Sequence, residues 1–168
     1  ASFNSPVGIV VDTAGDGTIY VADSGNNCIR KISPAGRTST LAGSRTWGYY
    51  DNAIGTAAQF NFPTGVAVDL LGNVYVVDSG NARIRRVTPA GSTSTVAGSG
   101  LNSVSNGVGT SAAFNLPWGI VVGKASNLFI SDRGANLIRT IYLTSANAAC
   151  DSVWHNLAIT HGDGSTSG

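Results

Sequence analysis

The sequence predicts an all-β chain made of three copies of a four-stranded antiparallel meander. Its prolines Pro6, Pro63 and Pro117 lie 57 and 54 residues apart. An aspartate and an arginine recur with nearly the same period, as Asp23, Asp78 and Asp132 and as Arg30, Arg85 and Arg139. Short β-branched runs alternate with Gly, Pro and Asn clusters, as strands and turns do. A fixed period of about 50 residues is typical of propellers, solenoids and other repeat arrays.

The first copy shows the unit in full. Its four expected strands are Val7–Val11, Thr18–Ala22, Cys28–Ile32 and Thr38–Ala42. The first is a short apolar run, which predicts a strand buried on both faces. The others alternate apolar and polar residues and are rich in Thr, Ile and Tyr, which favours half-buried strands. Turn clusters separate them, and in the Asp-Ser-Gly-Asn turn we expect the glycine to take a positive φ.

The second copy repeats this order, and the third departs from it. The links 44–59 and 99–113 join the copies and both end in a Gly-Thr-x-Ala pattern. The third copy has Gly123 where the second has Asp69, and after Ile141 it lacks the Pro-Ala-Gly turn. We expect its fourth strand within Ser152–Thr160, followed by a flexible tail over 161–168.

The composition excludes several classes of protein. The 168 residues carry a net charge of +1 and only 11% are charged, which is unlike the basic surface of a nucleic-acid-binding protein. No apolar run approaches the roughly 18 residues that predict a membrane-spanning helix. Low charge with many small polar residues favours an extracellular or cell-surface protein. The chain begins at Ala1, which indicates a processed chain or a fragment.

Motifs in all three copies closely resemble the NHL repeat. The second copy reads FNFPTGVAVD, then GNVYVVDSGN, IRRV, PAG and TVAG. The resemblance extends over residues 3 to about 141. It implies blades of a β-propeller, usually six-bladed, with the first strand of each blade lining the central channel. Residues 1–160 would then form three blades, at about 3–43, 60–98 and 114–160, or half of a six-bladed ring.

Three blades leave a ring open, and this carries the functional hypothesis. A blade buries its apolar faces against its neighbours, so the outer faces of the first and third blades would be exposed. Exposed apolar patches of that size mark interaction sites. We therefore expect a non-catalytic scaffold that assembles with itself, as a ring-closing dimer or a filament, or with further blades of a longer protein. The alternative is a propeller module that binds a protein or peptide ligand.

The recurring Asp and Arg residues are interpreted as structural. The aspartates suit turns, because their side chains bond nearby backbone groups, and the arginines suit bidentate pairs with the recurring aspartates, within a blade or between blades. Two functional alternatives stay open. Oxygens of the three Asp loops could hold a hard cation such as calcium. The arginines, with Arg83 and Arg85 in the second copy, could instead form a basic face for an anionic ligand.

Aromatic residues supply the other candidate binding site. Trp47, Tyr49 and Tyr50 cluster on a Gly-rich link, where large amphipathic rings favour recognition. They could equally pack beneath that link. Trp118 follows Pro117 at the start of an inner strand, so it would plug the channel or contact a partner blade.

Nothing in the sequence predicts catalysis, a cofactor or a metal. Some propellers that resemble this chain are metal-dependent lyases, but such a site needs several histidines around the channel, and His155 and His161 lie outside the blades. Asp12 and Asp69 could be read as a carboxylate pair, yet Gly123 in the third copy favours turn capping instead. Cys28 and Cys150 permit one disulfide in an oxidising compartment or remain two unpaired thiols.

Overall fold

The computed structural model describes residues 2–124 and 127–143, and these form three separate antiparallel sheets. We call the sheets blades 1, 2 and 3. Blade 1 consists of β1 (Pro6–Val11), β2 (Ile19–Asp23), β3 (Cys28–Ile32) and β4 (Thr38–Ala42). Blade 2 consists of β5 (Pro63–Val68), β6 (Val74–Asp78), β7 (Arg83–Val87) and β8 (Thr93–Ala97). Blade 3 consists of β9 (Pro117–Val122), β10 (Leu128–Asp132) and β11 (Leu137–Ile141).

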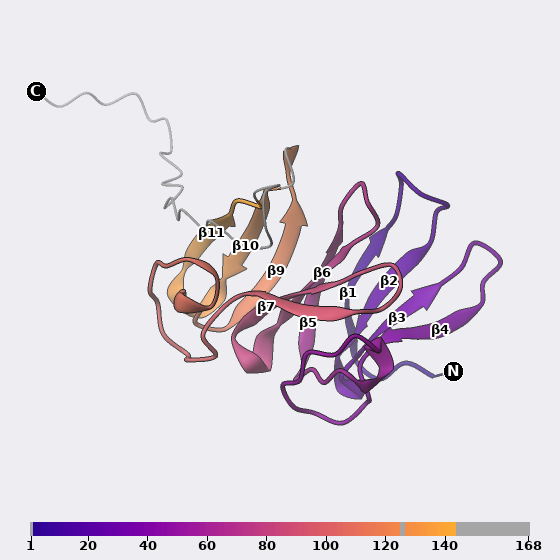
Figure 1. The fold of residues 1–168 in the computed structure, drawn as a ribbon, viewed down its shortest axis with the longest axis horizontal. Coiled ribbons are helices and arrows are strands. Elements are labelled where there is room, and N and C mark those ends of the chain that lie inside the picture. Colours follow the sequence, from indigo (N-terminus) through magenta and orange to yellow (C-terminus); the bar gives the residue numbers. More distant parts are fainter. Residues whose placement is uncertain (1, 125–126, 144–168) are drawn as a thin grey trace, which may run out of the picture.

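Each blade is a meander in which consecutive strands pair, so strand order follows the chain. Figure 1 shows the three sheets side by side in chain order, with β5 between β1 and β9. The first strands of the three blades are therefore neighbours, which is the arrangement of a β-propeller. The all-β prediction and the four strands expected in each of the first two copies are confirmed. The fourth strand and the tail expected after Ile141 lie outside the described residues.

Two apolar clusters hold the blades together, one at each junction. Between blades 1 and 2, Tyr20, Ala22 and Ile29 pack against Val66, Val74 and Val76. Between blades 2 and 3, the opposite face of blade 2 packs against Ile120, Leu128 and Ile130, among others. The core thus lies between sheets rather than inside one, and the middle blade has both faces covered.

Blade 1 has a neighbour on one face only, and this corrects one expectation. Strand β5 is almost fully buried, but most residues of β1 are exposed or half-buried. The prediction that Val7–Val11 is buried on both faces is therefore wrong. The sequences of β1 and β5 are alike, so the difference comes from the position of blade 1 at the open end of the array.

The turn after the second strand of each blade also differs from expectation. It is a single 3-10 turn at Ser24–Asn26, Ser79–Asn81 and Arg133–Ala135. The positive φ falls on the next residue, namely Asn27 (50°), Ala82 (48°) and Asn136 (56°), and not on the glycine. Gly80 is required for another reason, because a Cβ there would lie 2.6 Å from the side chain of Asn61.

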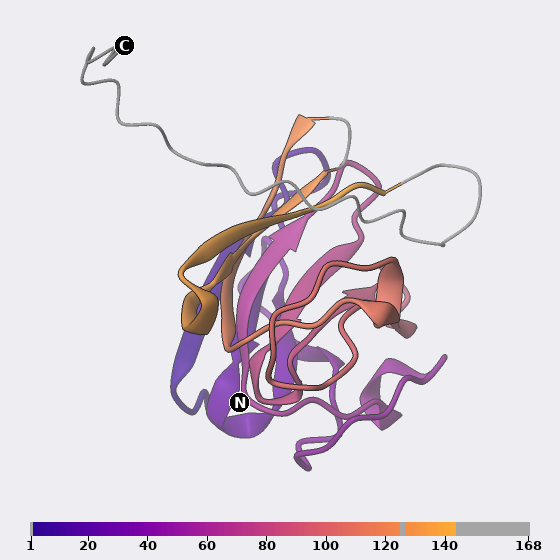
Figure 2. The same cartoon turned by 90° about the vertical axis from the view of Figure 1, so that its left-hand side faces the viewer.

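The two segments that join the blades, residues 44–59 and 99–113, lie on the same side of the sheets, to their right in Figure 2. We call residues 44–59 link 1 and residues 99–113 link 2. Each carries one 3-10 turn, Gly55–Ala57 and Gly109–Ser111. Within the described residues, no helix has the length and apolar character needed to cross a bilayer.

Candidate functional site: the arginine pockets and the open blade faces

The recurring Asp and Arg side chains meet inside each blade. In blade 2, Nη1 of Arg85 donates to Oδ2 of Asp78 at 2.7 Å, and both side chains are fully buried. In blade 3 the same atoms of Arg139 and Asp132 lie 3.1 Å apart. In blade 1 the approach is looser, since Nε of Arg30 lies 3.9 Å from Oδ2 of Asp23. The arginine comes from the third strand and the aspartate from the end of the second.

The aspartate also anchors the loop that leads into its blade. Its Oδ1 accepts the backbone N–H of an asparagine in the Phe-Asn-x-Pro motif, at 2.7 Å from Asn4, 2.8 Å from Asn61 and 2.8 Å from Asn115. This role explains why the two motifs recur together. Burial raises the pKa of the Asp78 and Asp132 carboxyls, while the N–H donors and the paired guanidinium act in the opposite direction. Burial likewise lowers the pKa of Arg139.

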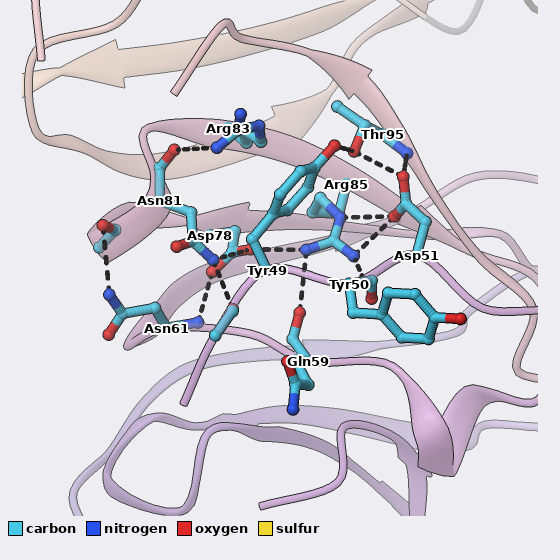
Figure 3. A network of polar contacts seen from close by, with 12 residues as sticks. Tyr49, Tyr50, Asp51, Gln59, Asn61, Asp78, Asn81, Arg83, Arg85 and Thr95 are labelled. Carbon is cyan, nitrogen blue, oxygen red and sulfur yellow. Dashed lines mark hydrogen bonds and ion pairs between the residues drawn. The ribbon is translucent and has the colours of Figure 1, made fainter. Parts of the chain in front are cut away.

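Each buried arginine of blades 2 and 3 holds the link that precedes its blade. Figure 3 shows Arg85 between Asp78 and link 1. Its Nε and Nη2 both donate to Oδ1 of Asp51, at 2.9 and 2.6 Å, and further bonds reach the carbonyl oxygens of Tyr50 and Gln59. Oδ2 of Asp51 accepts from the N–H and hydroxyl of Thr95. The link is thereby fixed to the third and fourth strands.

Link 2 repeats this arrangement with an amide in place of the carboxylate. Nη2 of Arg139 donates to Oδ1 of Asn106 at 3.1 Å and to the carbonyl of Ser105 at 3.0 Å, and Nη1 donates to the carbonyl of Ala113. We call the site formed by the buried arginine, its aspartate and the fourth-strand threonine an arginine pocket. Sequence reasoning missed Asp51 and Asn106 because the links differ in composition and align poorly. Their only shared signal is their distance of 19 residues from the end of the preceding third strand, at Ile32 and Val87.

The aromatic candidates lie in two places, three on link 1 and Trp118 at the start of β9. Trp47 (71% exposed), Tyr49 and Tyr50 lie on the surface of link 1. The ring of Tyr49 stacks with Arg83, whose guanidinium carbon lies 3.8 Å from the ring centroid, so Arg83 packs against the link. Trp118 is half-buried at the start of β9, 6.2 Å from the ring of Phe62 in the preceding blade.

The remaining candidates are structural in their contacts or lie outside the described residues. Asp12 caps its turn by accepting the N–H of Gly15, and Asp69 accepts the N–H groups of Leu71 and Asn73. Cys28 is a free, fully buried thiol, whereas its proposed partner Cys150 lies outside the described residues. Among residues 2–124 and 127–143, no three His, Cys, Asp or Glu side chains are grouped to hold a metal ion.

A family model of the NHL repeat matches residues 3–32 and 60–87, which contain the first three strands of blades 1 and 2. The chain carries NHL repeats. Human NHL repeat-containing protein 2 is 31% identical over 137 residues, which are 74% of this chain and 19% of that protein. The chloroplastic protein SUPPRESSOR OF QUENCHING 1 of Arabidopsis thaliana is 37% identical over 83 residues, or 49% of this NHL chain and 8% of that protein.

Solved propellers agree with the NHL assignment. A protein of unknown function from Bacteroides thetaiotaomicron is 28% identical with a TM-score of 0.69, over 83% of this chain and 36% of that one. An auxiliary nutrient binding protein of the same species is 24% identical with a TM-score of 0.65, over 79% and 36%. A streptogramin B lyase shares the fold at 18% identity and a TM-score of 0.53, over 80% and 36%. The NHL chain therefore spans well under half the length of these proteins.

Proposed function

We propose that this NHL chain is a non-catalytic interaction scaffold that associates head to tail through its two open blade faces. The proposal rests on one observation. The open face of blade 1 has aliphatic residues at the same positions as the face of blade 2 that is buried against blade 1. The face of blade 1 that has no neighbour, here called the entry face, bears the exposed Ile9 and Val11, the half-buried Ile32 and the buried Val21. The residues at the same positions of blade 2 are Val66, Val68, Val76 and Val87, and they pack against blade 1.

The entry face thus resembles the face of blade 2 that is buried at the junction of blades 1 and 2. Ile9 is 68% exposed, and with Phe3, Pro6 and Val7 it lines an apolar hollow of about 310 Å³. Removing such aliphatic surface from water contributes about 25 cal/mol per Å², which favours association with another blade.

The opposite end of the array offers the complementary surface. On the open face of blade 3, here called the exit face, Val121 is 59% exposed and is the cross-strand partner of Phe129. Ile138, opposite Ser131 on β11, is the third apolar residue of this face. These positions correspond to Ala67, Tyr75 and Ile84, which pack against blade 3. An exit face normally receives the entry face of the next blade, so blade 3 of one copy matches blade 1 of another.

A polar pair supports the same orientation. At the junction of blades 1 and 2, Oδ1 of Asn27 accepts the N–H of Phe62, which has a positive φ, at 2.9 Å. Asn136 occupies the position of Asn27 on the exit face, and Ser5 occupies that of Phe62 on the entry face, also with a positive φ. Both are exposed. Head-to-tail contact would let Asn136 accept the N–H of Ser5.

The carboxylates support a role without catalysis. Asp12 and Asp69 are engaged in turns, and Asp78 and Asp132 are paired with buried arginines, so each already serves the fold. Assembly into a closed dimeric ring or a filament follows from the same contact, depending on the angle between copies. The extracellular location expected from composition stays a prediction.

The experiment is light scattering after size exclusion, on the chain and on two charge variants. Ile9→Lys places a cation on the entry face and Val121→Lys places one on the exit face. Either variant should reduce a dimer or larger species to monomer, because a lysine cannot be buried there without a partner. Leu70→Lys is the control, since Leu70 is 86% exposed on a turn away from both faces. A wild-type chain that is monomeric at all concentrations contradicts the proposal.

A second candidate is a binding propeller within a longer protein, favoured by the share of the relatives that the chain spans. In that case further blades of the same polypeptide cover the open faces. An auxiliary nutrient binding protein has the same fold. By analogy, the longer protein would bind a ligand at the channel mouth near Trp118. Longer forms of the chain that stay monomeric while the 168-residue chain assembles would favour this candidate.

A further inference from the structure

Blade 1 contains an arginine pocket without a link in it. Arg30 is 7% exposed, and its buried Nε has no hydrogen-bond partner among residues 2–124 and 127–143. Nη1 of its guanidinium donates to the hydroxyl of Thr40 at 2.6 Å. In the filled pocket of blade 2, the equivalent Nε of Arg85 donates to Asp51, and the equivalent Thr95 donates to the same carboxylate.

We propose that the Arg30 pocket is a binding site for an extended peptide segment of the link type, supplied by a second propeller unit. The segment presents one carboxylate or amide side chain to Nε and Nη2 of Arg30. It also presents a backbone carbonyl in the place of Tyr50. This inference rests on the proposed head-to-tail association, because the segment would enter together with the neighbouring blade.

The backbone beside the Arg30 pocket offers carbonyl groups with which such a segment could pair. Link 1 runs beside the chain that enters blade 2. The N–H groups of Gly48 and Tyr50 donate to the carbonyls of Phe60 and Gln59, at 3.0 and 3.5 Å. Link 2 makes the same kind of bridge to Phe114. Ser2 and Phe3 occupy the positions of Gln59 and Phe60 ahead of blade 1, and both are exposed. An incoming strand can therefore pair with their carbonyls.

A third contact point repeats as well. Nδ2 of Asn81 donates to Oδ2 of Asp78 and to the carbonyl of Gly48 in link 1, both at 2.8 Å. Asn26 stands in the same place in blade 1, where its Nδ2 donates to Oδ2 of Asp23 at 2.9 Å. Its second amide hydrogen reaches only the carbonyl of Ser2 at 3.4 Å, a long bond that a link carbonyl would replace.

Charge favours an acidic segment over a neutral one. A buried guanidinium with an unsatisfied N–H loses its hydration without full compensation, and a carboxylate restores it with a charge-assisted bond. Link 1 uses Asp51 for this purpose and link 2 uses Asn106. Because a carboxylate and an amide both occur at this place in the links, we infer that the ligand is an extended segment with Asp or Asn opposite Arg30. The segment with Asp should bind more tightly.

The test joins the sequence of link 1 directly ahead of Phe3 in the full chain, so that the added aspartate can reach Arg30. We expect the thermal midpoint of unfolding to rise by roughly 3–6 °C, as several charge-assisted bonds would produce in a chain of this size. Replacing the added aspartate by Ala should remove most of the rise. In an Arg30→Lys background the added link should give little gain, because lysine lacks the planar fork of donors.

These results test binding in the Arg30 pocket independently of the assembly state. The assembly state is measured on the same samples by light scattering. A rise that depends on the added aspartate supports the pocket even if the chain without the addition is monomeric. A midpoint unchanged by the added link, or an equal rise with the Ala version, overturns the inference. In that case loss of assembly on Ile9→Lys would still stand as support for the blade faces.

Discussion

Nη1 of Arg85 lies 2.7 Å from Oδ2 of Asp78, and neither side chain is exposed to solvent. This pair connects three parts of the protein that are far apart in sequence. The aspartate holds the loop ahead of blade 2 through Asn61, and the arginine holds link 1 through Asp51. Loss of either partner therefore affects the strands, the entering loop and the link together.

The first prediction concerns the unequal importance of the buried arginines. Arg85→Ala leaves the Asp78 carboxylate buried and unpaired, so we expect a loss of about 3–5 kcal/mol in the free energy of unfolding. Arg30→Ala should cost clearly less, because Arg30 lies 3.9 Å from Asp23 and binds no link. Urea unfolding followed by circular dichroism measures both. The exposed Arg37→Ala serves as control, and equal losses at Arg30 and Arg85 would contradict the interpretation.

The second prediction compares the two links. Asn106→Asp places a carboxylate beside Arg139, as Asp51 lies beside Arg85, and should raise the free energy of unfolding by about 1 kcal/mol. The reverse exchange, Asp51→Asn, should lower it by about 1–2 kcal/mol, because one carboxylate there serves both Arg85 and Thr95. Chemical denaturation of the two variants at neutral pH tests this. A destabilising Asn106→Asp would show that the two pockets are not equivalent.

The third prediction uses a glycine in each inner strand. A Cβ on Gly65 would lie 2.8 Å from the carbonyl oxygen of Trp118, and a Cβ on Gly8 would clash with the carbonyl of Thr64 in the next blade. Gly8→Ala should therefore cost about 1–3 kcal/mol of stability. Gly119 has the same position on the exit face, where a Cβ meets only the hydroxyl of Ser131, at 3.0 Å.

Gly119→Ala should accordingly fold with a stability within about 0.5 kcal/mol of the wild type but fail to associate with a second copy. Unfolding curves and light scattering on one preparation separate the two effects. Normal assembly of this variant would argue against the exit face as the contact surface.

The fourth prediction concerns the thiol of Cys28. Burial, together with the nearby charge of Asp23, raises the pKa of this group. Because the folded-state pKa exceeds the unfolded one, ionisation favours the unfolded chain, and stability is lost as the pH rises past the ordinary thiol pKa of about 8.5. A Cys150→Ser variant, in which only Cys28 can react, should resist iodoacetamide at pH 8–9 and react fully in denaturant, as mass spectrometry would show. Rapid modification of the native variant would be inconsistent with this burial.

Much of the fold could be predicted from sequence because its signals are local. β-branched alternation and turn clusters located the four strands of blade 1 to within one residue and predicted the same order of strands in blade 2. The exposure of β1 could not be predicted from its own residues, since Ile9 and Val66 are chemically alike and only the presence of a neighbour distinguishes them.

The candidate site was predictable only in part. The recurrence of Asp78 and Arg85 indicated a structural pair but not whether it forms within a blade or between blades, and the structure places it within blade 2. The link residues Asp51 and Asn106 are different amino acids in dissimilar segments. The positive φ falls on Ala82, whereas Gly80 lies too close to Asn61 to carry a Cβ. Such contacts join residues about 20 to 35 positions apart, and composition or periodicity does not encode them.

The apolar faces and the arginine pockets hold the blades together in different ways, and sequence changes can therefore affect them separately. Blade-to-blade packing buries apolar side chains, mostly Val, Ile, Ala and aromatic residues, at both junctions. The pocket instead recognises a single side chain on the link, carboxylate at one junction and amide at the next. Changing one residue of a link can therefore alter the strength of one blade junction without a change in either blade. In a duplicated array, the junction with the weakest link contact would then be the first to open.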